Sequence, residues 1–156
     1  MDNAERTVER LNDLIKIHND RVHGYERAIK ETPDEQSDLK LLFTSFIGDS
    51  HQFKLALATE VQAFGRDIEN TTSGSGDIHR AWINVKAFFT GHNPKSVFEE
   101  CEFGEDATLK AYRSALDDEH LPAYLRETLT EQLATLQLAH DKVKGLRDAE
   151  RADQKG

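Results

Sequence analysis

Four side chains able to bind a metal ion stand where the helical pattern of this sequence predicts core residues: His18, Glu102, Glu105 and His140. The first interrupts an apolar stripe that steps by four and three residues: Leu11, Ile15, His18, Val22, Tyr25 and Ile29. The two glutamates interrupt a second stripe with the same steps: Phe98, Glu102, Glu105, Leu109, Tyr112 and Leu116. Such stepping is typical of a helix face packed against other helices. Because imidazoles and carboxylates bind iron and manganese, the pattern predicts a candidate metal site inside a helical bundle.

The two stripes can be aligned with each other, which suggests two similar helical hairpins. When Tyr25 is set on Tyr112, His18 falls on Glu105. Antiparallel pairing then brings a set of polar residues within about two turns near mid-bundle: His18, Asp49, Ser50, Glu102, Glu105, Gln137 and His140. Buried carboxylates and imidazoles are costly unless they are paired or metal-bound, so a functional site is expected in this polar layer.

Two interpretations of the polar layer remain open. Di-metal bundles of the ferritin type take one glutamate from each of two helices and a Glu-x-x-His motif from each of the other two. No glutamate here has a histidine three residues later, so that complete set is absent. A reduced iron or manganese site on the four residues above is one interpretation. In the other, His18 makes a charged hydrogen bond to Glu105, and the layer fixes the register of the helices.

The apolar periodicity predicts helices over residues 4–31, 94–116 and 123–151, a helix that opens near 32–35 and continues to 69, and a shorter helix over 77–90. Each of the three prolines falls at an expected helix start, where a missing N–H is harmless. Thr32 and Glu35 have the spacing of a capping box for the second helix. The apolar period continues through Gly65, which is therefore placed inside that helix.

The connection between the two hairpins decides the predicted topology. Residues 70–76 have the composition of a loop, and the helix expected over 77–90 would rise about 21 Å, enough to cross most of a bundle. This favours one long crossover over a simple up-and-down arrangement. The predicted fold is all-α: a ferritin-like four-helix bundle of two helical hairpins with an additional crossover helix, which Trp82, Phe88 and Phe89 hold against the bundle.

Composition limits the partners and the location. The net charge of −9 and the pI of about 5.2 argue against nucleic acid or an anionic membrane as a partner. A single cysteine, Cys101, excludes an internal disulfide and fits a reducing compartment. The first residues lack the apolar core of a secretory signal, and no stretch approaches a membrane span, so a cytoplasmic location is expected.

The chain is expected to form a single domain over residues 1–151, followed by a frayed tail over 152–156. A homodimer is a further expectation. The second helix, about 52 Å long as predicted, should overhang its neighbours and expose Phe64 and Ile68.

Three segments, LNDLIKIHNDRVHGYERAIK, GSGDIHRAWINVKAFF and CEFGEDATLKAYRSAL, resemble an uncharacterised bacterial family of ferritin-like four-helix-bundle proteins, a domain of unknown function. The resemblance extends from about Leu11 to Arg147 and is most specific at residues 79–82 and 102–106. It implies a ferritin-like bundle, a bacterial source and a loose link to stress response. It implies no activity, and the iron ligands of the ferritin superfamily do not carry over because Glu-x-x-His is missing.

Three functional hypotheses follow. The first is a structural or interaction protein, non-enzymatic and associated with stress. The second is an iron- or manganese-binding protein or oxidase with a reduced ligand set in the core. The third is a carrier of a small ligand in a bundle cavity. The missing di-metal motif favours the first.

Overall fold

The computed structural model describes residues 2–69, 71, 77–83, 85 and 94–155. In these residues the regular structure is helical: α1 (Asn3–Glu31), α2 (Ser37–Ala63), α3 (Asp77–Ile83), α5 (Pro94–Leu116) and α6 (Ala123–Lys155). The predicted all-α bundle is confirmed. The bounds of α5 are those predicted, whereas α6 continues through residues 152–155, which the sequence pattern placed in a tail. None of the described helices is long and apolar enough to cross a membrane.

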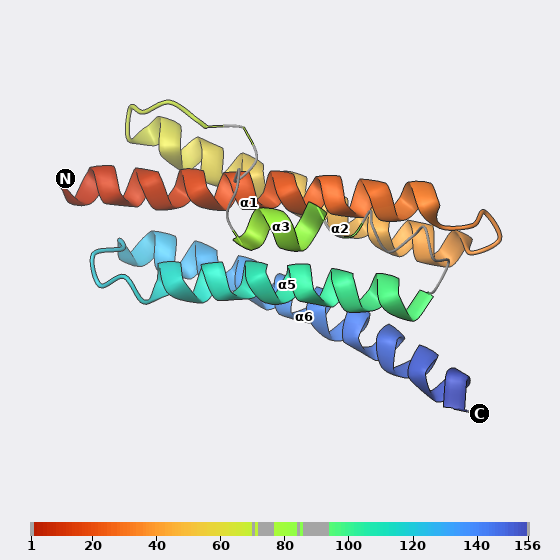
Figure 1. Cartoon of the computed structure of the whole chain (residues 1–156). Helices are drawn as coiled ribbons and strands as arrows, with labels where there is room; N and C mark the ends of the chain where they lie inside the picture. Colours follow the sequence, from red (N-terminus) through yellow and green to blue (C-terminus); the bar gives the residue numbers. More distant parts are fainter. Residues whose placement is uncertain (1, 70, 72–76, 84, 86–93, 156) are drawn as a thin grey trace.

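The helices form two antiparallel hairpins, α1 with α2 and α5 with α6, that lie against each other (Figure 1). Helices α2 and α5 run in the same direction, so the chain travels back along the bundle between them. Helix α3 lies in that connection and packs on both α1 and α5. The crossover helix predicted over 77–90 is thus helical over 77–83. Its remainder, with Phe88 and Phe89, falls largely outside the described residues.

The turn between α1 and α2 differs from the prediction. Thr32 ends α1 instead of opening α2, because its hydroxyl and its backbone N–H both donate to the carbonyl of Ala28, at 2.6 and 3.0 Å. Helix α2 begins at Ser37, and its N-cap, Gln36, makes no side-chain capping bond. The predicted capping box of Thr32 and Glu35 was therefore wrong.

Helix α2 ends at Ala63, well short of the predicted Glu69. Gly65 adopts a left-handed conformation (φ 72°), with its N–H bonded to the Gln62 carbonyl and the Arg66 N–H bonded to the Val61 carbonyl. These two bonds are a Schellman motif, which glycine favours because it has no Cβ. The chain turns at Gly65, and both Phe64 before it and Ile68 after it pack against the core. The predicted overhang of this helix was wrong.

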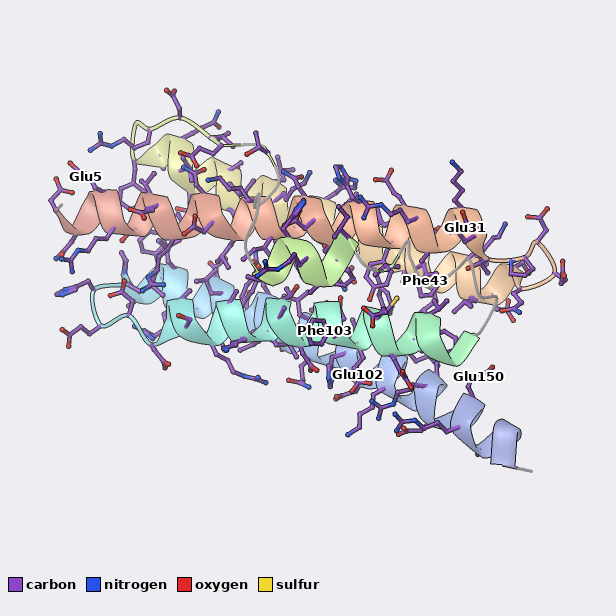
Figure 2. All side chains as sticks on the ribbon, in the orientation of Figure 1. Glu5, Glu31, Phe43, Glu102, Phe103 and Glu150 are labelled. Carbon is purple, nitrogen blue, oxygen red and sulfur yellow. The ribbon has the colours of Figure 1, made fainter. Side chains whose placement is uncertain are left out.

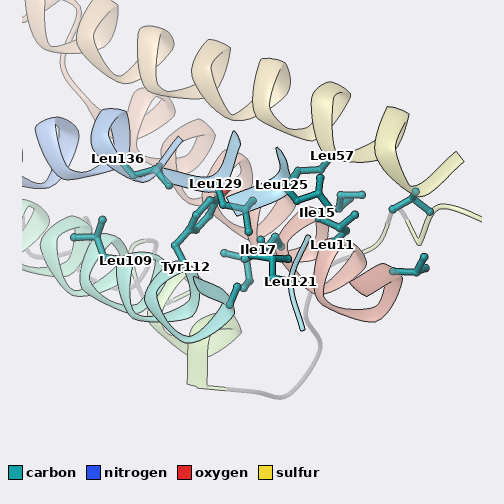
Figure 3. Packing of buried hydrophobic residues seen from close by; sticks show 14 residues of the cluster. Leu11, Ile15, Ile17, Leu57, Leu109, Tyr112, Leu121, Leu125, Leu129 and Leu136 are labelled. Carbon is teal, nitrogen blue, oxygen red and sulfur yellow. The ribbon is translucent and has the colours of Figure 1, made fainter. Parts of the chain in front are cut away.

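Among the described residues the core consists of two apolar clusters at different levels of the bundle. One, drawn in Figure 3, contains Leu11, Ile15, Leu109, Leu125 and Leu129 among others, with side chains pointing toward one another from α1, α5 and α6. The other gathers around Tyr25, Phe43 and Trp82. Buried polar residues lie between the two clusters along α1, α2 and α5, so the polar layer predicted at mid-bundle exists.

Trp82 anchors α3 between the two hairpins. Its side chain is fully buried, and its Nε1 donates to Thr108 Oγ1 of α5 at 3.1 Å. Gly24 of α1 and Gly104 of α5 flank the indole, and a Cβ added at either glycine would lie 2.6 Å from a ring carbon. The two glycines therefore create the slot that holds Trp82. That Trp82 anchors the crossover helix was predicted, whereas the role of the glycines was not.

Candidate functional site

An ion pair lies at the centre of the polar layer. Arg21 Nε donates to Glu105 Oε1 at 2.6 Å and Nη2 to Oε2 at 3.3 Å, and both side chains are at most 1% exposed. The Tyr25 hydroxyl donates to the same carboxylate at 3.1 Å. Arg21 Nη1 reaches the Phe46 carbonyl and Ser50 Oγ at 2.9 and 2.8 Å. The carboxylate and the guanidinium thus satisfy each other within a low-dielectric core.

The same arginine is held by aromatic rings, since its guanidinium carbon lies 5.3 Å from the Tyr25 ring centre and 5.5 Å from that of Phe46. Burial acts to lower the pKa of Arg21, but the charge and hydrogen bond of Glu105, together with Tyr25 and Asp49, offset it, and the net pKa is raised. Arg21 therefore stays charged at any accessible pH.

His18 joins this pair to α5 and α6 through a directional chain of hydrogen bonds. Its Nδ1 lies 3.0 Å from Ser50 Oγ, its Nε2 lies 2.6 Å from the Tyr112 hydroxyl, and that hydroxyl donates to Gln132 Oε1 at 2.6 Å. Because Tyr112 donates to Gln132, it accepts from His18 Nε2–H. Ser50, which accepts from Arg21, then donates to His18 Nδ1. This assigns a neutral imidazole protonated at Nε2.

The surroundings of His18 also favour the neutral form. Burial, followed by the positive charges of Arg21 and Lys54, holds its pKa well below the ordinary value of 6.5. Burial raises the pKa of the Tyr112 hydroxyl, which stays protonated as the donor in the chain. Within the part of the chain that the structure describes, no buried side-chain polar atom lacks a hydrogen-bond partner. The layer is a closed network rather than an open ligand set.

The neutral state of His18 predicts a pH dependence of stability. The unfolded chain takes up a proton at this residue near pH 6.5, whereas the folded chain does so only at lower pH. The free energy of unfolding should therefore fall below pH 6.5, by up to about 1.4 kcal/mol per pH unit from this group. Urea denaturation of the wild type and of His18→Gln between pH 7.5 and 5 measures it. The wild-type curve should be steeper, and parallel curves would contradict the assignment.

The structure divides the four predicted ligands between two places. His18 and Glu105 lie in the buried layer but have different partners, so the predicted hydrogen bond between them is not formed. Glu102 and His140 lie instead at the rim between α5 and α6, where their side chains are only 12% and 13% exposed, with 4.0 Å between Glu102 Oε1 and His140 Nε2. Figure 2 labels Glu102 where these two helices run side by side. Of the other residues expected in the layer, Ser50 belongs to it, whereas Gln137 makes surface hydrogen bonds.

Sequence reasoning missed Arg21, the residue that satisfies Glu105. Arginine is seldom fully buried, and a charged residue beside a stripe is ordinarily assigned to solvent. One signal could have found it. A glutamate at a core position needs a positive partner. His18 is the residue that aligns with Glu105, and Arg21 follows it by about one helical turn. Tyr25, Tyr112 and Gln132 belong to the network too, although only the tyrosines were noted, as core residues.

A second cluster of ionisable groups lies on the surface of the second hairpin. Glu102 and Asp106, one turn apart on α5, meet His140 of α6, and one ligand atom from each lies within 4.8 Å of the others. His140 Nε2 is 2.7 Å from Asp106 Oδ1, and its Nδ1 is 3.1 Å from Asp141 Oδ1. A carboxylate on the second ring nitrogen is the usual way to orient a metal-binding imidazole. Arg147, however, forms an ion pair with Glu102.

A groove of about 980 Å³ lies between α1 and α5, beside α3. Its apolar lining includes Leu14, Ile17, Ile78, Ala81, Ala107 and Ala111. Phe103, labelled on α5 in Figure 2, also lines it and is 57% exposed. Charged residues line it as well: Arg10, Asp13, Lys16, Arg80, Asp106 and Lys110. The volume is that of a typical ligand site. The groove is therefore the candidate place for the small ligand of the third hypothesis.

The helices and the closed polar layer define an all-α helical bundle. The chain belongs to the family described as a domain of unknown function (DUF2383), whose sequence profile matches residues 6–118. The match takes in both members of the Arg21–Glu105 pair, Trp82 and its two glycines, and it ends before α6. No curated protein matches the chain.

Proposed function

We propose that the chain is a ferritin-like four-helix bundle with a non-enzymatic, structural or interaction role that it performs through its surface. The observation that carries this proposal is the Arg21–Glu105 ion pair. In di-metal bundles, inward-facing carboxylates neutralise metal ions at mid-bundle. Here a guanidinium provides the positive charge, and the imidazole beside it has both nitrogens engaged by hydroxyl groups. The core is thus completed by side chains alone.

The course of the chain supports the ferritin-like class. The same direction of α2 and α5 requires one long crossover between the hairpins, which distinguishes that arrangement from simple up-and-down bundles. The bacterial source and the stress-associated role implied by the family resemblance belong to the same proposal. So does a cytoplasmic location, which the single, buried Cys101 supports. The net charge of −9 supports a partner other than nucleic acid.

A second candidate function is binding of a divalent metal, iron or manganese, at the surface cluster of Glu102, Asp106 and His140. Two carboxylates and an imidazole from two helices can approach one ion from the same side. This candidate keeps Glu102 and His140 of the predicted ligands and replaces the buried His18 and Glu105 by Asp106. Arg147 would have to release Glu102 before that carboxylate could bind the ion.

Metal content separates the two candidates. The protein, purified without chelator or affinity tag, is dialysed anaerobically against Fe(II) or Mn(II). Its metal content is measured, and Fe(II) oxidation is followed on admitting oxygen. The first proposal expects no bound metal and no oxidation above the protein-free rate. One metal per chain that His140→Asn abolishes would support the surface site instead. Metal retained by His140→Asn with rapid Fe(II) oxidation would contradict both.

A further inference from the structure

The outward face of α2 carries no formal charge over about six turns, in a chain of which 31% of residues are charged. From Leu41 to Ala63, ten exposed residues lie within about 60° of the direction of Gly48 on a helix that turns 100° per residue: Leu41, Thr44, Ser45, Gly48, His51, Gln52, Leu55, Thr59, Gln62 and Ala63. None is Asp, Glu, Lys or Arg. We call this face the α2 seam. Helix faces open to solvent ordinarily carry charged residues, so the seam needs an explanation.

Gly48, at the middle of the seam, is not explained by contacts within the described chain. A Cβ added there would meet nothing within 4 Å among the described residues, whereas Gly24 and Gly104 both accommodate the Trp82 ring. Glycine is, after proline, the least favourable residue in a helix interior. A glycine on an open helix face permits the close approach of another backbone, and among the described residues none supplies one here.

The large apolar residues of the seam are symmetric about this glycine. Leu41 and Leu55 stand seven residues before and after Gly48, and they are 67% and 70% exposed. If a second α2 crosses antiparallel with a two-fold axis at Gly48, each Leu41 meets the Leu55 of the other copy. The two glycines then face each other at the point of closest approach. That is the self-complementarity that an isologous contact requires.

We propose that the α2 seam binds the α2 seam of a second copy of this chain in antiparallel orientation. Charge supports this occupant, because each copy carries a net charge of −9 and two copies meet most readily through a face without charges. The inference rests on the proposed function, in which the polar layer of the core is closed and the chain interacts with partners through its surface. The seam covers roughly 30 Å by 10 Å per copy, well below the 800 Å² of a standard interface, so the dimer should dissociate on dilution.

Cysteine cross-linking tests the contact and its direction. The native Cys101 does not interfere, because it is buried and burial raises the pKa of its thiol. Under mild oxidation Gly48→Cys should form disulfide-linked dimers at least tenfold faster than Leu138→Cys, an equally exposed position (70%) on α6. A mixture of Leu41→Cys and Leu55→Cys should yield mainly the mixed dimer, whereas a parallel contact would link each variant to itself. Equal rates at positions 48 and 138, or self-linkage of Leu41→Cys, would overturn the proposal.

Sedimentation velocity provides a measurement without cysteines. The wild type should show a sedimentation coefficient that rises with concentration. Leu55→Glu should remain a monomer throughout, because it places two negative charges in the symmetric contact. Leu138→Glu, matched in exposure and in charge, should behave as the wild type. A wild type that is monomeric at millimolar concentration, or equal effects of the two variants on the sedimentation coefficient, would overturn the proposed contact between α2 seams. A protein that stays monomeric, binds no metal and does not accelerate Fe(II) oxidation would overturn this inference alone. A dimer that oxidises Fe(II) rapidly would overturn only the proposed function.

Discussion

Replacing Arg21 with methionine is expected to lower the free energy of unfolding by about 3–5 kcal/mol. The substitution leaves the Glu105 carboxylate at 0% exposure without its ionic partner, and it takes a donor from Ser50 and from the Phe46 carbonyl. Breaking one side of a buried pair is severe because the remaining charge has no water to solvate it. Chemical denaturation followed by circular dichroism at pH 7 measures the change.

The matched control is Arg10→Met. Arg10 also forms an ion pair with a carboxylate, that of Asp118 at 2.8 Å, but the arginine side chain is 37% exposed. Water screens such a pair, so the control should lose no more than about 1 kcal/mol. The double variant Arg21→Met, Glu105→Leu should recover most of the loss, because it removes both charges and fills the space with apolar groups. A small effect of Arg21→Met alone would mean that Glu105 is not buried as described.

The double variant also separates two roles of the polar layer. If the layer only avoids an unpaired charge, the variant folds to the same rigid structure, with near-ultraviolet circular dichroism like that of the wild type. If the layer fixes the register of the helices, the variant keeps its helix content but loses that signal. Apolar clusters lie on both sides of the layer, so slippage of one hairpin along the other is the alternative that the layer would prevent.

The helices were largely predictable because their causes are local. The stripe through Leu11 and Tyr25 has the period of a packed helix, and the proline at position 94 marks the first residue of α5. The end of α2 was not predictable from periodicity. Apolar residues recur at helical spacing on both sides of Gly65, so the pattern continues where the helix stops. The helix ends because Gly65 adopts a left-handed backbone conformation, which a pattern of hydrophobicity does not reveal.

The site was predictable only in its level along the bundle. Spacing placed His18, Ser50 and Glu105 together, and all three lie in the buried layer. Glu102 and Glu105 are separated by only about 60° around α5, so the stripe could not tell which one faces the core. The packing of α6 decides it, since it leaves Glu102 beside Arg147 at the rim. Which partner satisfies each buried group depends on side-chain reach, as with Arg21, and sequence spacing does not specify that.

Replacing Gly104 with leucine is expected to expel Trp82 from its slot and to lower the free energy of unfolding by about 3–5 kcal/mol, the range for losing a large buried aromatic side chain. The added Cβ alone would lie 2.6 to 2.8 Å from three atoms of the indole. The ring cannot retreat, because Gly24 approaches it just as closely and the Tyr25 ring lies 5.1 Å away, centre to centre. Gly145→Leu is the control, since a Cβ there meets nothing within 4 Å among the described residues and should leave stability unchanged or slightly raised.

Trp82 is the only tryptophan, so its fluorescence reports on the slot directly. In Gly104→Leu the emission should shift to longer wavelength as the indole becomes hydrated and loses its hydrogen bond to Thr108, whereas Gly145→Leu should emit as the wild type. If Gly104→Leu acts by steric exclusion of Trp82, a double variant gives a further test. Once Trp82→Ala has emptied the slot, the introduced leucine has room, so the double variant should be more stable than Gly104→Leu alone. Additive losses would mean that the leucine acts on the backbone of α5 and that the two side chains do not compete for one space.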